Sequence, residues 1–237
     1  KPAGAATGRV NIHAEAAGLL RLDPNGLKRL NRIDERLTVA TLPDLSMVGP
    51  KQMVATVKII PFSVPQEILG QWEDVARQDM LTLQPFQPQK LFFIQTLLAG
   101  TKPSVLDKTS RVLSARAATV GAEIQGESRC AHSPEALHGA IAEALKAHDP
   151  DILILAGASA VTDRQDVLPS AIEAAGGEIS HFGMPVDPGN LLLTGRIGDT
   201  GVIGMPGCAR SPKLNGFDWV LQRLCAGLNV TREDIMD

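Results

Sequence analysis

Aromatic side chains are scarce in this 237-residue sequence: tyrosine is absent, and aromatic residues make up only 3% of the chain. Proteins that bind single-stranded nucleic acid stack the bases on aromatic rings and follow the phosphates with a basic surface. The formal net charge of −3 offers no excess of basic residues for such a surface. We therefore expect no nucleic-acid partner.

Cysteine is scarce as well. Cys130, Cys208 and Cys225 are odd in number and too few for a disulfide framework, which favours a reducing, cytoplasmic location. No apolar run approaches the length of a membrane span, and no secretory signal is visible, so we expect no membrane partner. The sequence begins at Lys1 and not at methionine, which is compatible with the loss of an N-terminal segment that carried a signal.

Several common functional motifs are missing. The histidines are scattered, and the pair Cys130 and His132 has no second pair at zinc-site spacing, so we discard it as a metal site. The sequence contains no Walker loop, no G-x-G-x-x-G fingerprint and no serine nucleophile elbow. The function must therefore be sought in less familiar loops.

The first part of the chain, residues 1–84, predicts a small α+β lobe, and hydrophobic residues amount to 44% of the whole sequence, enough for a substantial core. Residues 1–8 are small and predict a flexible loop, and the proline-containing stretch 84–88 predicts a linker to a second lobe. Within the first lobe we expect strands at 19–22, 37–42 and 53–61, and helices at 25–34 and 65–78.

From Lys90 the pattern alternates between apolar strands and amphipathic helices, which predicts a second domain over residues 90–237. Such alternation is typical of an α/β fold with a doubly wound, mostly parallel sheet and helices on both faces. The run Ile152–Leu155 is short and wholly apolar, so we expect it to be the central strand. The expected strands are 91–98, 122–126, 152–155 and 202–205, and the helices are 105–120, 134–147, 167–175 and 215–226.

Three loops in this domain concentrate small and polar residues. The first covers residues 157–166, the second is Asp187-Pro188-Gly189-Asn190, and the third covers residues 205–213. Proline followed by glycine in the second loop predicts a type II turn in which Gly189 has a positive φ. In open α/β sheets, ligands bind beyond the carboxyl ends of the strands. We therefore expect the three loops to form one polar cleft that accepts an anion.

A further loop, residues 100–109, lies between the first strand of this domain and its helix. Backbone N–H groups at a helix N-terminus favour phosphate, and Lys102, Ser104 and Lys108 supply charge or hydrogen bonds. The alternative is an ordinary connection in which Ser104 caps the helix and both lysines are solvated.

The segments GASAVTDRQDVLPSAI and AAGGEISHFGMPVDPGNLLLTGRIGDTGVIGMPGCARSPK resemble the molybdopterin-binding domain of molybdenum-cofactor biosynthesis proteins, the molybdotransferases and molybdopterin adenylyltransferases. The whole chain, from about Gly8 to Asp237, most resembles the molybdopterin-binding half of bacterial proteins fused to a cytidylyltransferase-type nucleotidyltransferase. The motifs of the wider family lie after Lys90. The resemblance implies molybdopterin as ligand or substrate, with ATP or molybdate as co-substrate.

The resemblance also implies roles for individual carboxylates. Asp163 matches the loop aspartate of the family, and Asp107 falls where related proteins have an acidic residue near the pterin phosphate or a metal, so both are candidate catalytic residues. Asp163 and Asp166 together are candidate ligands of Mg²⁺, which prefers oxygen. The alternative for Asp166 is a helix cap. Ser159 is a candidate donor to a phosphate or pterin oxygen, or else stabilises the turn.

In the third loop, Pro206 and Gly207 match the proline-glycine turn of the family, whose usual Asn-Pro continuation is replaced here by residues 208–213. The cations Arg210 and Lys213 precede a helix, where the helix dipole favours negative charge, so an anionic ligand explains them better. Cys208 is either a small packing residue or a molybdenum ligand. The predicted cofactor-binding set is Lys102, Ser104, Gly157, Ser159, Asp187, Pro188, Gly189, Asn190, Pro206, Gly207, Arg210 and Lys213.

Two functions remain open at the level of the sequence. The first is an enzyme of molybdenum-cofactor assembly that promotes adenylyl transfer or molybdate insertion. The second is a non-catalytic module that presents molybdopterin to a fused or separate nucleotidyltransferase. Ala158 and Ala160 stand in a loop that is richer in glycine in the family, and their Cβ atoms limit how closely the backbone approaches a pyrophosphate. Related domains often assemble, so a homo-oligomer is expected in either case.

Overall fold

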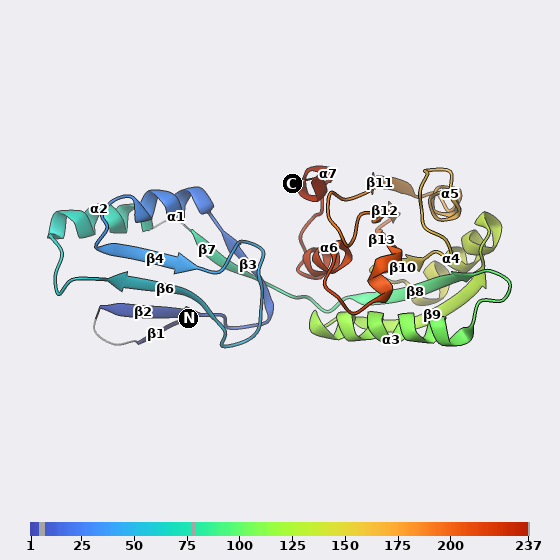
Figure 1. Ribbon diagram of the computed structural model, residues 1–237, viewed down its shortest axis with the longest axis horizontal. Coiled ribbons are helices and arrows are strands. Elements are labelled where there is room, and N and C mark those ends of the chain that lie inside the picture. Colours follow the sequence, from blue (N-terminus) through green and yellow to red (C-terminus); the bar gives the residue numbers. More distant parts are fainter. Residues whose placement is uncertain (5–7, 77–78, 237) are drawn as a thin grey trace. The chain divides into compact units, whose positions relative to one another are not determined.

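The computed structural model describes residues 1–4, 8–76 and 79–236 (Figure 1). The chain divides into two compact units, Lys1–Phe86 (unit 1) and Gln87–Asp237 (unit 2). Each unit has its own sheets and its own buried apolar residues. Within the described ranges, no helix combines the length and the hydropathy that a membrane crossing requires.

Unit 1 contains two antiparallel sheets and two helices. One sheet has the order β1-β2-β6-β4, and the other has the order β5-β3-β7. Helix α1 begins after Asp23, whose side chain accepts a hydrogen bond from the Asn25 N–H, as its sequence position predicts. The elements are β1 (Pro2–Gly4), β2 (Arg9–His13), β3 (Gly18–Leu22), α1 (Pro24–Asn31), β4 (Leu37–Thr41), β5 (Met47–Val48), β6 (Met53–Ile59), α2 (Gln66–Ala76) and β7 (Leu81–Pro85).

Two expectations for unit 1 are wrong. Pro2–Gly4 belongs to a strand paired with β2, although the expected loop also includes residues 5–7, which lie outside the described residues. The expected linker begins inside β7, which pairs along its length with β3. Pro85 is tolerated because it is the last residue of that strand. Strand β7 pairs with a strand that is distant in sequence, and β1 consists of small residues, so local composition conceals both strands. The expected helix over 65–78 reaches residues 77–78, which also lie outside the described residues.

Unit 2 is built on a six-stranded sheet with the order β11-β12-β13-β10-β8-β9. The strands β13, β10, β8 and β9 are parallel, and β12 runs antiparallel to both of its neighbours. Its elements are β8 (Lys90–Leu97), α3 (Pro103–Thr119), β9 (Glu123–Ala131), α4 (Pro134–His148), β10 (Ile152–Ala156), α5 (Val167–Ala174), β11 (Glu178–Phe182), β12 (Leu193–Ile197), β13 (Thr200–Met205), the 3₁₀ helix η1 (Gly207–Arg210), α6 (Gly216–Cys225) and α7 (Arg232–Met236).

The two faces of this sheet are covered by different helices. Leu153 and Leu155 of β10 share one buried cluster with residues of α4 and α5. On β8, Ile94 joins that cluster, whereas its neighbour Gln95 points to the other face and donates to the Leu106 carbonyl of α3. Helix α6 is joined to α3 by an ion pair. The predicted mostly parallel α/β fold with helices on both faces is thereby confirmed, and β10 is buried throughout and paired on both sides.

The edges of the sheet were harder to predict. Strand β9 extends to Ala131, beyond the expected end at Gly126. The expected end is too early because charged residues such as Glu127 and Arg129 alternate with less exposed ones on this edge strand. The short strands β11 and β12 contain too few apolar residues to stand out in the sequence.

Candidate functional site

The exits of several strands lie at one edge of the sheet in unit 2. Strands β8, β9, β10 and β13 are parallel, so their carboxyl ends share this edge, and β11 runs in the same direction because two antiparallel pairings separate it from β13. The loops that leave from this edge are 98–102, 157–166, 183–192 and 206–215. We call it the carboxyl edge.

The loop after β13 is shaped by a buried arginine. Arg116 of α3 donates from Nε to Asp218 Oδ1 at 2.5 Å, from Nη1 to the Ala209 carbonyl at 2.7 Å and from Nη2 to the Ser211 carbonyl at 2.8 Å. It also reaches the Lys213 carbonyl at 3.0 Å, and Asp218 closes a capping box with Asn215 at the start of α6. One side chain therefore satisfies three loop carbonyls that would otherwise be hard to bury.

Arg210 lies on this loop and reaches toward the neighbouring one. Its Nη2 donates to the Gly157 carbonyl at 2.6 Å, which joins the loops after β13 and β10. Burial lowers the pKa of the Arg210 guanidinium, and no carboxylate pairs with it in the part of the chain that the structure describes. A partly desolvated cation without an anionic partner is costly, so this position favours an anion.

The loop after β10 is braced from within by Asp166. Its Oδ2 accepts hydrogen bonds from the Thr162 N–H at 2.6 Å and the Asp163 N–H at 3.0 Å, and these bonds hold the pKa of the carboxyl below its usual value. Asp166 occupies the N-cap position of α5 without capping it by a side-chain hydrogen bond. The alternative role of Asp166 as a helix cap is therefore correct in its position but wrong in its contact, because the carboxylate turns back to its own loop. Asp163 Oδ1 accepts from the Gln165 N–H at 2.7 Å.

His132, which has no zinc-site partner in the sequence, joins several strand exits at the carboxyl edge. His132 follows β9, and its Nε2 is 2.7 Å from Ser159 Oγ while its Nδ1 is 2.8 Å from Thr96 Oγ1. Thr96 in turn accepts from the Ala158 N–H at 2.8 Å. Three strand exits are therefore linked through one imidazole. The position of His132 between a strand and the Ser133 helix cap marks it as a candidate site residue in the sequence. A pattern of paired zinc ligands does not include it.

The loop after β11 lies against the start of α6. The Pro188 carbonyl accepts from the Gly216 N–H at 3.1 Å, and Asn190 donates from Nδ2 to the Met184 carbonyl. Gly189 has the expected positive φ, but its value of +131° departs from the type II turn, which needs about +80° at that position. A Cβ at Gly189 would lie 2.6 Å from the Gly216 nitrogen, so close packing against α6 decides the conformation.

A family model described as a probable molybdopterin binding domain matches residues 95–225, more than half of the chain. The chain belongs to this family. The match begins in β8 and ends in α6, so it includes all the loops at the carboxyl edge. No curated protein matches the chain at a significant level.

Solved structures resemble the molybdopterin-binding domain more distantly. A molybdopterin biosynthesis MoeA protein from Pyrococcus horikosii is 14% identical, with 94% of this chain and 71% of that chain covered and a TM-score of 0.46. The molybdopterin biosynthesis enzyme MoaB of Thermus thermophilus is 14% identical over 59% of this chain and 97% of its own, with a TM-score of 0.43. A molybdenum cofactor biosynthesis protein from Corynebacterium diphtheriae, described as putative, is 16% identical over 64% and 100%, with a TM-score of 0.40. Such values transfer no reaction to this chain.

Some predicted site residues of the molybdopterin-binding domain are in contact, and others are not. Arg210 meets Gly157, Ser159 meets His132, and Asp163 meets Asp166. Asp107 instead accepts a hydrogen bond from Arg129 Nη2 at 2.7 Å, next to the edge strand β9. Its charge is therefore balanced by the protein itself.

The remaining predicted residues belong to the loops at the carboxyl edge or to the start of α3, and their side chains take no part in the contacts of the preceding paragraph. Lys102, not Ser104, is the N-cap of α3, and it makes no side-chain cap bond, so the expected capping by Ser104 is wrong. Pro206 is buried, whereas Gly207 and Cys208 are exposed at the start of η1. Lys213 is exposed and contributes its carbonyl to Arg116.

The carboxylates of the loop after β10 are the candidate ligands for Mg²⁺. In residues 1–4, 8–76 and 79–236, no group of three or more histidine, cysteine and acidic side chains is placed to hold a metal. Asp163 and Asp166 each use one oxygen for backbone N–H groups, and neither second oxygen has a hydrogen bond to another described residue. Mg²⁺ is usually bound by one or two carboxylates together with water and substrate phosphates. This pair therefore fits Mg²⁺ only when a substrate phosphate completes the site.

Proposed function

We propose that the molybdopterin-binding domain acts in molybdenum-cofactor biosynthesis by holding molybdopterin at the carboxyl edge of its sheet. The observation that carries this proposal is Arg210, a partly buried cation bonded to the Gly157 carbonyl and without a carboxylate partner among the described residues. Guanidinium binds phosphate by paired hydrogen bonds, so Arg210 would receive the phosphate of the pterin.

The neighbouring loops would supply the rest of the contacts. The imidazole of His132 holds the Ser159 hydroxyl in one place, so Ser159 would offer a positioned hydrogen bond to a phosphate or pterin oxygen. The second and third loops would contact the body of the pterin, and the N-terminus of α3 would add positive potential. The proposed contact residues are Lys102, Ser104, Gly157, Asp187, Pro188, Gly189, Asn190, Pro206, Gly207 and Lys213.

Mg²⁺ is part of the catalytic form of this proposal. The free oxygens of Asp163 and Asp166 would hold it, and the ion would supply positive charge to the phosphates of ATP or to molybdate. Asp163 is the exposed member of the pair, and Asp166 keeps the loop in shape. A catalytic role for Asp107 would require Arg129 to release it.

The alternative is a non-catalytic module that presents molybdopterin to a fused or separate nucleotidyltransferase in the cytoplasm, as a homo-oligomer. It is supported by the commitment of Asp166 to its own loop and of Asp107 to Arg129. Ligand binding needs no release of Asp107 from Arg129, whereas a catalytic role for Asp107 does.

The binding proposal is tested by Arg210→Ala, with Arg164→Ala, an exposed arginine of the neighbouring loop, as the matched control. Losing a charge-assisted hydrogen bond costs about 1.5–3 kcal/mol, so we expect molybdopterin to bind roughly 10- to 100-fold more weakly to Arg210→Ala. The loss should shrink as salt rises, because salt screens the attraction. Equal affinity in Arg210→Ala and the parent protein would contradict the proposal.

Single-turnover assays with molybdopterin, ATP, Mg²⁺ and molybdate decide between enzyme and module. Turnover that is lost in Asp163→Asn while binding persists supports the enzyme. Binding without turnover in the parent protein supports the module and removes the catalytic assignment of Asp163.

A further inference from the structure

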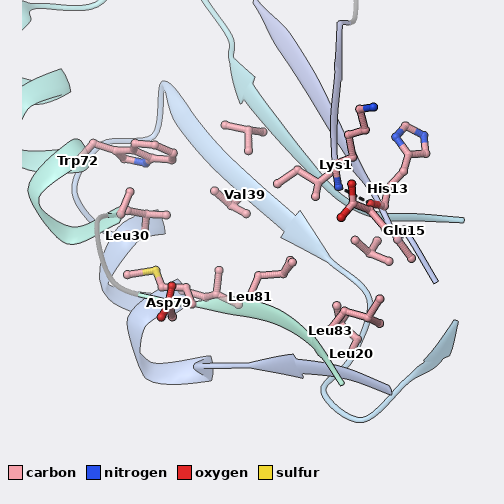
Figure 2. Close-up of a pocket in the computed structure, with 17 residues that line it drawn as sticks. Lys1, His13, Glu15, Leu20, Leu30, Val39, Trp72, Asp79, Leu81 and Leu83 are labelled. Atoms are coloured by element: carbon pink, nitrogen blue, oxygen red, sulfur yellow. Dashed lines mark hydrogen bonds between the residues drawn. The ribbon is translucent and has the colours of Figure 1, made fainter. Parts of the chain in front are cut away.

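Unit 1 contains a cavity of about 420 Å³ between its two sheets (Figure 2). Strands β2, β4 and β6 provide one wall, β3 and β7 provide another, and α1 and α2 close one end. Protein interiors normally contain few voids larger than a water molecule, whereas ligand pockets occupy roughly 300–1,000 Å³. The size of this cavity is therefore that of a ligand pocket.

The cavity is lined mainly by aliphatic side chains. Leu20 and Val54 are almost completely buried in the small core between the sheets, and Leu83 packs against that core. Figure 2 shows Leu30, Val39 and Leu81 around the same space. A lining of this kind favours an apolar occupant, because it offers few hydrogen bonds to replace those that a polar molecule loses on leaving water.

Trp72 brings a buried polar group to this mainly aliphatic lining. Trp72 of α2 stands at one end of the cavity in Figure 2, and its Nε1 is buried without a hydrogen-bond partner among the described residues. The indole N–H is a donor only, and a buried donor without an acceptor is costly. A ligand in the cavity with an acceptor at the Trp72 end would satisfy this donor.

Charged groups at the two ends limit the choice of acceptor. Asp79 lies on the same side of the view as Trp72, and Lys1, His13 and Glu15 lie on the opposite side (Figure 2). An anionic ligand would meet the carboxylates of Asp79 and Glu15 in the lining, whereas a neutral carbonyl oxygen accepts the indole N–H without that repulsion.

We propose that unit 1 binds a small, uncharged, mostly apolar molecule whose carbonyl-type oxygen accepts a hydrogen bond from Trp72 Nε1. This site is independent of the one proposed for molybdopterin, because every residue that lines it belongs to unit 1. Its occupant is a ligand class that the carboxyl edge of unit 2, with its charged side chains, does not favour.

The probe for this site is the neutral dye prodan, a naphthalene that carries one ketone. The chain has two tryptophans and no tyrosine, so in a Trp219→Phe parent the protein emission comes from Trp72 alone. We expect saturable, one-to-one binding with a blue shift of the dye and quenching of Trp72 by energy transfer to it. Binding that does not saturate, or that leaves Trp72 emission unchanged, would overturn the proposal.

Two variants locate the probe. Trp72→Phe keeps an aromatic ring and removes the donor, and we expect prodan to bind about 3- to 10-fold more weakly, as for one lost hydrogen bond. Val39→Phe fills part of the cavity and should abolish saturable binding. Circular dichroism and thermal melting confirm that each variant is folded. Unchanged binding to folded Val39→Phe would overturn the site, and unchanged binding to Trp72→Phe would overturn the assigned acceptor.

Discussion

Each unit has a candidate binding region, and the two are built in opposite ways. In unit 2 one face of the sheet buries an apolar cluster, and the candidate recognition groups lie on loops beyond the strand ends, held by polar contacts such as those of Arg116 and His132. In unit 1 the space lies between the sheets and is lined mainly by aliphatic side chains, and the buried Trp72 donor has no partner among the described residues.

The difference follows from how the sheets are covered. A parallel sheet needs helices on both faces, so the space for a ligand remains at its edge, where loops carry backbone dipoles and charges. Two small antiparallel sheets that face each other leave space wherever their side chains are too short to meet. The first arrangement suits a charged ligand, and the second suits an apolar one.

The largest expected effect tests whether polar contacts hold the edge of unit 2. Arg116→Ala leaves Asp218 and three loop carbonyls without their donor, and removing one partner of a buried ion pair typically costs about 3–5 kcal/mol. Urea denaturation followed by Trp219 in a Trp72→Phe background measures the loss in unit 2. Arg111→Ala, an exposed arginine on the same helix, is the control and should change the free energy of unfolding by less than about 0.5 kcal/mol. Equal stability of the two variants would show that Arg116 does not hold this loop.

A second test compares the two interiors. Leu153 is fully buried in the filled core of unit 2, so Leu153→Ala should cost about 3–4 kcal/mol. Leu83 borders the cavity and is only partly buried, so Leu83→Ala should cost about 1–2 kcal/mol. Each loss is measured in urea with the tryptophan of the same unit. Equal losses would mean that the cavity of unit 1 is packed like the core of unit 2.

A smaller effect concerns helix caps, which both units use alike. Ser133 caps α4 through the Ala136 N–H, and Asp23 caps α1 through the Asn25 N–H. Ser133→Ala and Asp23→Ala should each cost about 1 kcal/mol in denaturation experiments. Ser104→Ala is the matched control, because Ser104 does not cap α3, and it should be close to neutral. A loss at Ser104 as large as at Ser133 would restore the capping role that the sequence suggested.

The smallest effect is the pH dependence of the loop after β10. The N–H groups of Thr162 and Asp163 lower the pKa of Asp166, so its bracing is fully present above the ordinary aspartate pKa and is lost as pH falls through the lowered one. The Thr162 amide signal in NMR spectra should follow this titration. Asp166→Asn should remove it, and a Thr162 signal that titrates equally in Asp166→Asn would assign the change to another group.

Much of unit 2 could be predicted because its signals are local. The apolar run 152–155, the Ser133 cap and the alternation of strands and helices each depend on residues close together in sequence. Strand β7 does not stand out because its partner β3 is distant in sequence, and β1 does not stand out because it consists of small residues. At the candidate site, the loops could be predicted, but the side chains that hold them could not, because Arg116 contacts residues about a hundred positions away.

The sequence by itself determined the central strand of unit 2, which loops carry small and charged residues, and which family the chain resembles, because period, turn chemistry and motifs act over short distances. Only the tertiary structure decided that His132 joins Ser159 to Thr96, that Asp166 braces its own loop, that Arg129 neutralises Asp107, and that unit 1 has a cavity lined in part by Trp72. The physical reason is that a side chain's partner and the space between sheets depend on how distant segments pack, which no local pattern encodes.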